Sequence, residues 1–258
     1  MGGGTFAHPA YAPWADLLAA GTLPGFARLA ALARERGLSA ANGRPLALVQ
    51  GAGAGALAYE NAIARDGRIR MRPDDPHDAF NALAWLAFPR AKAALNAVHV
   101  RDQAAATGNA RSRARDAATL LDESGLLLGS ADPELVALLR RRRWREVFVE
   151  RRAAAATALH PLAIGHGLLV KLQAPYRALT AHALIVPVDA AAMARCDGGR
   201  PLIDAAAAHA IADPSFAPES LLPLPVAAFC GWDAEGLGER LFDDASVFRP
   251  PRVTLSAP

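Results

Sequence analysis

The sequence predicts an α+β fold: a single, mostly helical domain with a small β-sheet. Its 258 residues are 52% apolar and 21% charged, a balance typical of globular proteins and not of disordered chains. Helix-start signals recur, as in Asp75-Pro76 and Asp132-Pro133, where a capping aspartate precedes a proline at the first helical position. The clearest strand, residues 181–188, is short and apolar.

The sequence does not divide into separate parts. It contains neither an internal repeat nor a linker of the kind that separates domains. Residues 1–258 are therefore expected to form one domain. Residues 1–25 and 233–258 are rich in Gly or Pro with aromatic anchors, so we expect them to wrap over its periphery.

The segment between residues 26 and 72 predicts an amphipathic helix at 26–36 and a strand at 46–49, followed by a glycine-rich loop. Residues 51–56 match the G-x-G-x-x-A spacing of dinucleotide-binding proteins. Residues 68–72, however, carry three arginines, which favours an exposed edge over the buried parallel strand that such a site requires. We therefore favour a flexible loop over a dinucleotide site.

Residues 74–96 are the stretch around which the fold is expected to be organised. A helix is predicted at residues 76–88, and Pro89 should end it and begin another. Polar residues three and four apart share one end of one face, while larger apolar residues further on provide bulk for burial. These polar residues are His77, Asp78 and Asn81, and the apolar ones include Leu83, Trp85 and Leu86.

The second half of the chain predicts further short elements. Residues 119–128 have the composition of a β-hairpin with Asp122-Glu-Ser-Gly125 as its turn. A strand is expected within 157–164, followed by a helix at 165–171 that begins near His166. Trp144 and Phe148 are four apart and are expected to be buried, with neighbouring arginines on the solvent side. The Pro-rich segments from Pro223 onward are expected to wrap over the core.

Charge and cysteine usage limit the classes of function. The net charge is +3, and almost all of the positive charge comes from arginine. This balance is a weak indication of nucleic-acid contact. Cys196 and Cys230 are far apart, so a zinc knuckle is excluded and any metal ligands would be His and carboxylate. No apolar run is long enough for a membrane span, and no signal peptide is visible, so we expect a cytoplasmic location and no membrane partner.

Four blocks of residues together form a recognisable pattern: Tyr59-Glu60 through His77-Asp78, Asn81, Trp85, Lys92 and Asn96; Arg115-Asp116 with Asp122-Glu123; Gly165-His166-Gly167 with Lys171; and Pro223 through Gly231-Trp232 to Phe248. On these blocks the chain resembles a bacterial family catalogued as domain of unknown function 3025. The resemblance covers most of residues 59–252 and brings no established activity with it. Cys230 stands where the family has proline, so the resemblance implies no thiol function there.

One hypothesis is a metal-assisted hydrolase. Divalent ions prefer carboxylate oxygen and imidazole nitrogen, and polar residues at the ends of elements often assemble functional sites. Asp116 would orient an imidazole, and Arg115 or Lys171 would hold an anionic small-molecule substrate. The candidate metal ligands are His77, Asp78, Asp122 and His166, and the candidate catalytic set adds Asn81, Asp116 and Glu123.

The alternative hypothesis is a non-catalytic binding protein with an RNA or protein partner. The arginine-rich stretches at residues 111–115 and 140–145 would then form the contact surface. The His, Asp and Asn residues would form a buried hydrogen-bond network that fixes loop geometry. Neither hypothesis is supported by a familiar signature, because the sequence has no serine nucleophile elbow, P-loop or H-E-x-x-H motif.

Overall fold

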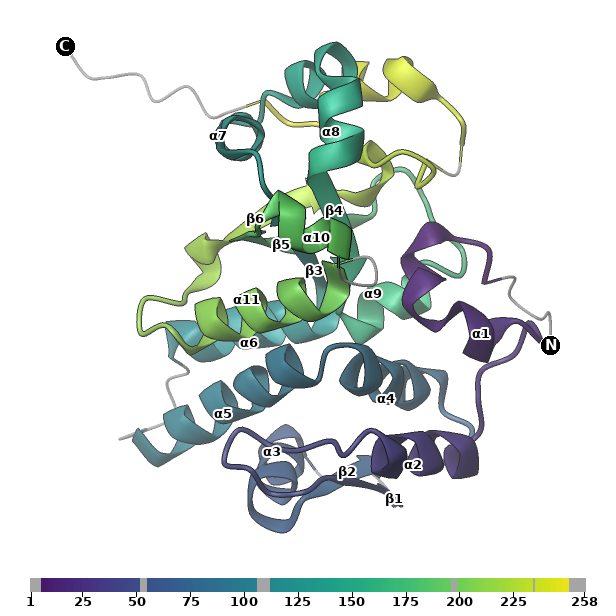
Figure 1. Ribbon diagram of the computed structural model, residues 1–258, viewed down its shortest axis with the longest axis vertical. Coiled ribbons are helices and arrows are strands. Elements are labelled where there is room, and N and C mark those ends of the chain that lie inside the picture. The colour runs from purple at the N-terminus through teal and green to yellow at the C-terminus, as the bar shows by residue number, and fades with distance from the viewer. Residues whose placement is uncertain (1–5, 52–54, 106–111, 196–198, 234, 251–258) are drawn as a thin grey trace.

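The computed structural model describes residues 6–51, 55–105, 112–195, 199–233 and 235–250, and it confirms the α+β fold class. Two small sheets are embedded among many helices (Figure 1). Among the described residues, no helix is both long and apolar enough to span a bilayer. The strands are β1 (Ala47–Gln50), β2 (Arg68–Met71), β3 (Gly125–Ser130), β4 (Leu159–Ala163), β5 (Thr180–Pro187) and β6 (Leu221–Pro225).

The helical segments form layers below and above the larger sheet in the view of Figure 1. Helices α6 and α11 lie beneath it, α4 and α5 form the next layer, and α2 and α3 flank the smaller sheet at the bottom. In chain order the helical segments are η1 (Pro9–Trp14), α1 (Ala15–Leu18), α2 (Phe26–Glu35), α3 (Ala56–Asp66), α4 (Pro76–Ala87), α5 (Pro89–Ala105), α6 (Arg113–Ser124), α7 (Pro133–Arg140), η2 (Glu146–Glu150), α8 (Arg152–Ala158), α9 (His166–Lys171), α10 (Ala190–Arg195), α11 (Arg200–Ala212), η4 (Pro218–Ser220), η5 (Val226–Ala228) and η6 (Gly238–Asp243).

The larger sheet has the strand order β4-β3-β5-β6. Strand β3 pairs antiparallel with β4 and parallel with β5, and Leu127 of β3 lies opposite Leu162 and Leu184. Every residue of β3 is buried, as expected for the apolar central strand of a covered sheet. The strand expected at residues 181–188 is confirmed as β5, with its bounds shifted by one residue.

The hairpin predicted at residues 119–128 is wrong. Helix α6 continues through Ser124 and passes directly into β3 at Gly125. The polar residues expected to form a turn are instead the last turn of this helix, in which the Ser124 hydroxyl donates to the Leu120 carbonyl oxygen. Gly125 permits the abrupt change, because a Cβ there would lie 2.0 Å from the Leu121 carbonyl oxygen.

The smaller sheet combines two features that the sequence analysis set against each other. Residues 68–72 were expected to form an exposed edge and not a buried parallel strand, and β2 is an edge strand of a two-stranded sheet that nevertheless pairs in parallel with β1. The three arginines are compatible with this pairing because Ile69 and Met71, on alternate positions, are buried. Helix α3 connects the two strands, so β1-α3-β2 is a parallel crossover unit. Gly53 of the preceding G-x-G-x-x-A match lies outside the described residues.

The Pro-rich segment from Pro223 onward was expected to wrap over the core, and part of it instead belongs to the larger sheet. Residues 221–225 form β6, which pairs antiparallel with β5 at the edge of the larger sheet. Pro223 is exposed on this edge strand, where the missing amide donor is tolerated. The same region contributes Phe229 and Trp232 to the core, and both side chains are buried.

Helix α4 is buried along almost its whole length, as predicted for the central stretch. Leu83, Trp85 and Leu86 are each at most 3% exposed, and the helix packs against α2, α5 and α9. Pro89 begins α5 immediately afterwards, as expected from its position. The N-terminal segment is anchored to the same helix, because the Trp14 indole nitrogen donates to the Leu83 carbonyl oxygen at 2.8 Å.

Burial also separates the aromatic and arginine residues around 140–148, as predicted. Trp144 and Phe148 are buried, at 5% and 8% exposure, whereas Arg141, Arg143 and Arg145 are exposed. Two of these arginines already have carboxylate partners on this chain. Arg143 lies 3.0 Å from Glu146, and Arg145 lies 2.6 Å from Asp243.

Replacement of Leu83 by alanine should test how far α4 supports the fold. We expect Leu83→Ala to lower the free energy of unfolding by about 2–5 kcal/mol, because it leaves a cavity at a fully buried position. The matched control is Leu57→Ala, which removes a 45% exposed leucine from α3 and should change that free energy by about 0.5 kcal/mol or less. Urea unfolding of both variants measures the difference, and equal effects would contradict a central role for α4.

Candidate functional site

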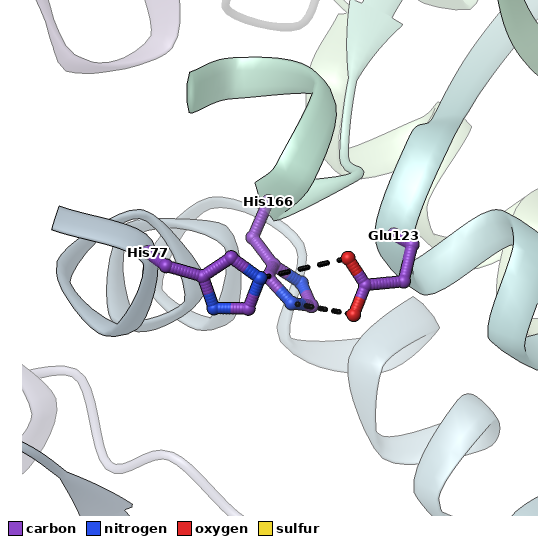
Figure 2. Close-up of side chains that lie close together, drawn as sticks. All are labelled: His77, Glu123 and His166. Carbon is purple, nitrogen blue, oxygen red and sulfur yellow. Dashed lines mark ion pairs between the residues drawn. The ribbon is translucent and has the colours of Figure 1, made fainter. Parts of the chain in front are cut away.

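Two histidines and one glutamate meet at a junction of three helices. His77 comes from the first turn of α4, His166 begins α9, and Glu123 lies in the last turn of α6. Figure 2 shows both imidazoles facing the Glu123 carboxylate, which lies to one side of the pair. The ring centroids are 4.3 Å apart and the rings are nearly perpendicular, at 86°.

The distances in this group exceed those of ordinary hydrogen bonds. The Nε2 atom of His77 lies 3.5 Å from Oε2 of Glu123, and Nε2 of His166 lies 3.4 Å from Oε1 of the same carboxylate. An N–H···O hydrogen bond joins its heavy atoms at about 2.7–3.2 Å. Contact with His166 nevertheless lowers the pKa of Glu123, so the carboxylate is ionised at neutral pH.

Each histidine has an aspartate on its opposite ring nitrogen. Nδ1 of His77 lies 3.8 Å from Asp78, and Nδ1 of His166 lies 3.9 Å from Asp122. The Nδ1 atom of His166 is buried and has no hydrogen-bond partner among the described residues. Two Asp–His pairs therefore bracket a single glutamate, and in both pairs Nε2 is the nitrogen that faces it.

The start of α4 fixes the first of these pairs. Asp75 caps the helix by accepting a hydrogen bond from the Asp78 amide at 3.1 Å, and Pro76 occupies the first helical position. Asp78 in turn accepts three bonds from Arg72: from its amide at 2.8 Å, from Nε at 2.9 Å and from Nη2 at 2.8 Å. Burial alone would raise the pKa of Asp78, but the bonds from Arg72 outweigh it, and the pKa is lowered.

A buried ammonium fixes the second pair. Lys92 is 3% exposed, and its Nζ donates to Oδ1 of Asn81 at 2.8 Å and to Oδ1 of Asp122. Asn81 extends this hydrogen-bond network to α3, because its amide nitrogen donates to the Tyr59 hydroxyl at 2.7 Å. Burial would raise the pKa of Asp122, but Lys92 and the neighbouring His166 outweigh it and lower the pKa to about 2. Asp122 is therefore a permanent anion.

Glycines allow Glu123 to approach His166. A Cβ on Gly165 would lie 2.3 Å from the Gly125 amide nitrogen, so the start of α9 and the end of α6 are in direct backbone contact. A Cβ on Gly167 would lie 2.8 Å from Oε2 of Glu123, within the space that the carboxylate occupies. Side chains at these two positions would push the α6 terminus away from His166.

The structure brings together most, but not all, of the residues singled out in the sequence. His77, Asp122, Glu123 and His166 lie in one cluster, and Asn81 reaches it through Lys92. The expectation that Asp122 and Glu123 sit on a hairpin turn is wrong, because both belong to the end of a helix.

The other expected site residues lie elsewhere. Asp116 belongs to the first turn of α6, six residues before Asp122 and so about 9 Å away along the helix axis. Arg115 is half-buried beside it, and its charge acts on His99 and lowers the pKa of that imidazole less than burial does. Lys171 is exposed in the last turn of α9, at the opposite end from His166.

The expected metal ligands differ in their surroundings. The carboxylates of Asp78 and Asp122 pair with Arg72 and Lys92, respectively. His77, Glu123 and His166 each offer a ligand atom, and these atoms lie within 4.8 Å of one another. A second such group of Asp75, His77 and Asp78 shares His77, but Arg72 pairs with both of its carboxylates. Glu123 is therefore the carboxylate best placed to bind a cation.

Sequence reasoning assigned no role to the residues that support this cluster on its buried side. Lys92 and Asn96 lie four apart on α5, and Tyr59 and Glu60 face them from α3. All four belong to the blocks that carried the family resemblance, and a lysine inside an alanine-rich helix was the available signal. Lys92 is one of only two lysines in the chain, the other being Lys171.

These two lysines provide a matched test of the buried network. We expect Lys92→Met to lower the free energy of unfolding by about 3–5 kcal/mol, because it leaves the Asp122 anion without its buried partner. Lys171→Met removes an exposed lysine and should change that free energy by about 0.5 kcal/mol or less. Chemical denaturation compares the variants, and a small effect at Lys92 would show that the ammonium does not hold the three helices together.

Comparison with known proteins identifies the family but not an activity. The family model described as "Protein of unknown function (DUF3025)" matches residues 47–252, which include every residue of the cluster and its supporting network. No curated protein and no solved structure matches the chain. Because the matched region spans most of the sequence, the chain belongs to the DUF3025 family of proteins of unknown function.

Proposed function

We propose that this protein is a metal-assisted hydrolase in which His77, Glu123 and His166 bind one divalent cation. The observation that carries the proposal is the placement of two imidazole nitrogens 3.4 and 3.5 Å from the two oxygens of one carboxylate. One ligand atom from each of the three residues lies within 4.8 Å of the others. Ligands about 2.0–2.2 Å from a tetrahedral metal ion lie roughly 3.3–3.5 Å from one another, so small side-chain movements would bring the three atoms around one ion.

The chemistry of the donor set fits a catalytic metal. Two histidines and one glutamate are a ligand set of catalytic zinc sites, in which a fourth position stays open for water or substrate. Glu123 also lies at the C-terminal end of α6, where the helix dipole favours a cation. Lys92 neutralises the neighbouring Asp122, but no lysine or arginine contact of Glu123 occurs in the described part of the chain.

The two aspartates support the proposed ligands. A metal-binding histidine usually directs its other ring nitrogen at a carboxylate, which fixes the tautomer and the ring orientation. The carboxylates of Asp78 and Asp122 lie 3.8 and 3.9 Å from these nitrogens, beyond hydrogen-bond distance but within reach of charge attraction, and the cations that hold them keep both ionised. This attraction favours a proton on Nδ1, which would leave Nε2 of each histidine available to a metal ion. Asp122 would thus favour this tautomer of His166 and, with a pKa of about 2, does not act as a general base.

The cluster is open on one side. The side chains of His77 and Glu123 are 43% and 52% exposed, whereas that of His166 is 6% exposed and forms the rear wall. A bound divalent ion would supply Lewis acidity and a water molecule acidic enough to attack at neutral pH. The open side gives a small-molecule substrate access to that water, while the buried side excludes bulk solvent from the His166–Asp122 pair.

Metal binding is the first test of the proposal. Protein purified without a metal-affinity step should bind about one Zn²⁺ per chain, measured by titration calorimetry and by metal analysis. His166→Ala and Glu123→Gln remove proposed ligands and should weaken binding by more than about 100-fold, whereas Asp122→Asn should weaken it by roughly 10–100-fold. Asp116→Asn is the control, because Asp116 lies outside the cluster, and its affinity should equal that of the native protein.

Hydrolysis is the second part of the same test. A panel of chromogenic carboxylic and phosphoric esters should reveal an activity that a chelator removes and Zn²⁺ or Mn²⁺ restores. Glu123→Gln should lack it and Asp116→Asn should retain it. Failure of the native protein to bind any of these ions would contradict the proposal, as would hydrolysis that survives the Glu123→Gln substitution.

The glycine contact with Glu123 generates a separate prediction. Gly167→Ala places a methyl group 2.8 Å from Oε2 of Glu123 and should weaken Zn²⁺ binding by about tenfold or more by displacing the carboxylate. Gly25→Ala is the matched control, because the added methyl group meets no atom within 4 Å and lies far from the cluster in sequence. Circular dichroism verifies that both variants fold. Equal affinity in the two variants would show that Glu123 does not depend on this contact.

A further inference from the structure

A second carboxylate, that of the half-buried Glu60, lies behind the proposed metal ligands. Glu60 of α3 shares a small cavity with Lys92, Asp122, Asn96 and Trp85. Two carboxylates and one ammonium therefore occupy one region that little water reaches. Lys92 donates to Asp122 and Asn81, and no hydrogen bond from Lys92 to Glu60 occurs in the described part of the chain. If both carboxylates were ionised, this region would carry an excess negative charge, which is costly where solvent screening is weak.

Only one of the two carboxyl oxygens of Glu60, Oε2, accepts a hydrogen bond in the described part of the chain. The Asn96 amide nitrogen donates to Oε2 of Glu60 at 2.6 Å and to its backbone carbonyl oxygen at 2.9 Å. A single neutral donor is weak compensation for a full negative charge. No hydrogen bond to Oε1 of Glu60 occurs in the described part of the chain, so it is the oxygen able to carry a proton.

The cavity that Glu60 lines has room for a hydrogen-bond partner of this proton. Its volume is about 10 Å³, close to the minimum that holds one water molecule. Trp85 lines the same cavity, and its buried indole nitrogen has no hydrogen-bond partner among the described protein atoms. A water molecule there would accept from Trp85 and connect to Glu60, which satisfies both groups.

The charged groups that face Glu60 are Lys92 from α5, Asp122 from α6 and His166 from α9. Two other titratable neighbours stay neutral near pH 7. Burial raises the pKa of Tyr59, and burial lowers the pKa of His99. The charge balance around Glu60 therefore depends on one ammonium, one permanent carboxylate and the charge at the His77–Glu123–His166 cluster.

We propose that Glu60 is a charge-compensating residue, which holds a proton while no cation is bound at His77, Glu123 and His166 and releases it when a divalent cation binds there. The proposal rests on the metal site put forward above. A cation beside His166 adds the positive charge that the buried region lacks, so ionised Glu60 becomes favourable. By thermodynamic linkage, loss of this proton strengthens metal binding as the pH rises.

The acidity of Glu60 supports this assignment. Burial, together with the neighbouring Asp122, raises its pKa to about 7, against the opposing effect of the Asn96 bond. An acid whose pKa is raised in the folded chain holds its proton up to that pKa, and the stability associated with this proton is lost as the pH rises through it. Near neutral pH the group is therefore poised to respond to an added charge.

Proton counting tests the proposal. Zn²⁺ is titrated into the protein by calorimetry just below neutral pH, in two buffers of different ionisation enthalpy, which gives the number of protons released per ion. Glu60→Gln keeps the Asn96 bond but has no acidic proton, so it should release up to about one proton fewer than the native chain. Glu150→Gln removes an exposed carboxylate and should match the native value.

Infrared spectroscopy of the same samples gives a direct readout. The metal-free native protein should show a protonated carboxyl band that disappears when Zn²⁺ is added, and Glu60→Gln should lack this band. Zn²⁺ binding with equal proton release in the native and Glu60→Gln proteins would overturn the role of Glu60 and leave the metal site intact. Absence of Zn²⁺ binding by the native protein would overturn both the metal site and the role of Glu60.

Discussion

The buried ammonium of Lys92 is the interaction on which the rest of this structure depends. Its bonds to Asn81 and Asp122 join α4, α5 and α6 at a point where no water competes. A buried charge pair contributes little net stability compared with apolar packing, but removal of one partner is costly, so the pair enforces one arrangement of the helices. That arrangement sets the distance between His77 on α4 and Glu123 on α6, and with it the geometry of the whole cluster.

The carboxylates of the cluster differ in their ion-pair partners. Asp78 and Asp122 are held by Arg72 and Lys92, so their charges are already matched and they act on the outer nitrogens of the histidines. In the described part of the chain, the ion-pair partners of Glu123 are the two imidazoles, so its carboxylate remains able to bind a cation. Sequence proximity hides this difference, since Asp122 and Glu123 are adjacent. Successive residues on a helix point about 100° apart, so one faces the buried lysine and the other faces the opening.

Elements whose start and composition are both marked in the local sequence were predicted correctly. The cap at Asp75, the prolines at 76 and 89 and the apolar run at 181–188 defined α4, α5 and β5 from sequence. The prediction of a hairpin at residues 119–128 was wrong because two different structures fit this composition. A helix that ends at Ser124 and is followed by an apolar strand has the same pattern of residues as two strands joined by a turn. Pairing of β3 with β5 decides between them, and it is a long-range contact. The meeting of the histidines was expected from their helix-start positions, but the proposal of Glu123 as a ligand depended on which carboxylates Arg72 and Lys92 neutralise.

The strand order has a consequence for how the chain is made. Strand β3 is buried throughout, yet both of its partners, β4 and β5, come later in the sequence. During synthesis the three leucines at 126–128 therefore leave the ribosome with no strand to pair with until residue 159 and beyond has emerged. His166 also appears only then, so a nascent or truncated chain that stops earlier exposes an apolar strand and lacks part of the cluster. Such fragments are candidates for chaperone binding and aggregation, and the His77–Glu123–His166 cluster can assemble only in a chain that extends past residue 166.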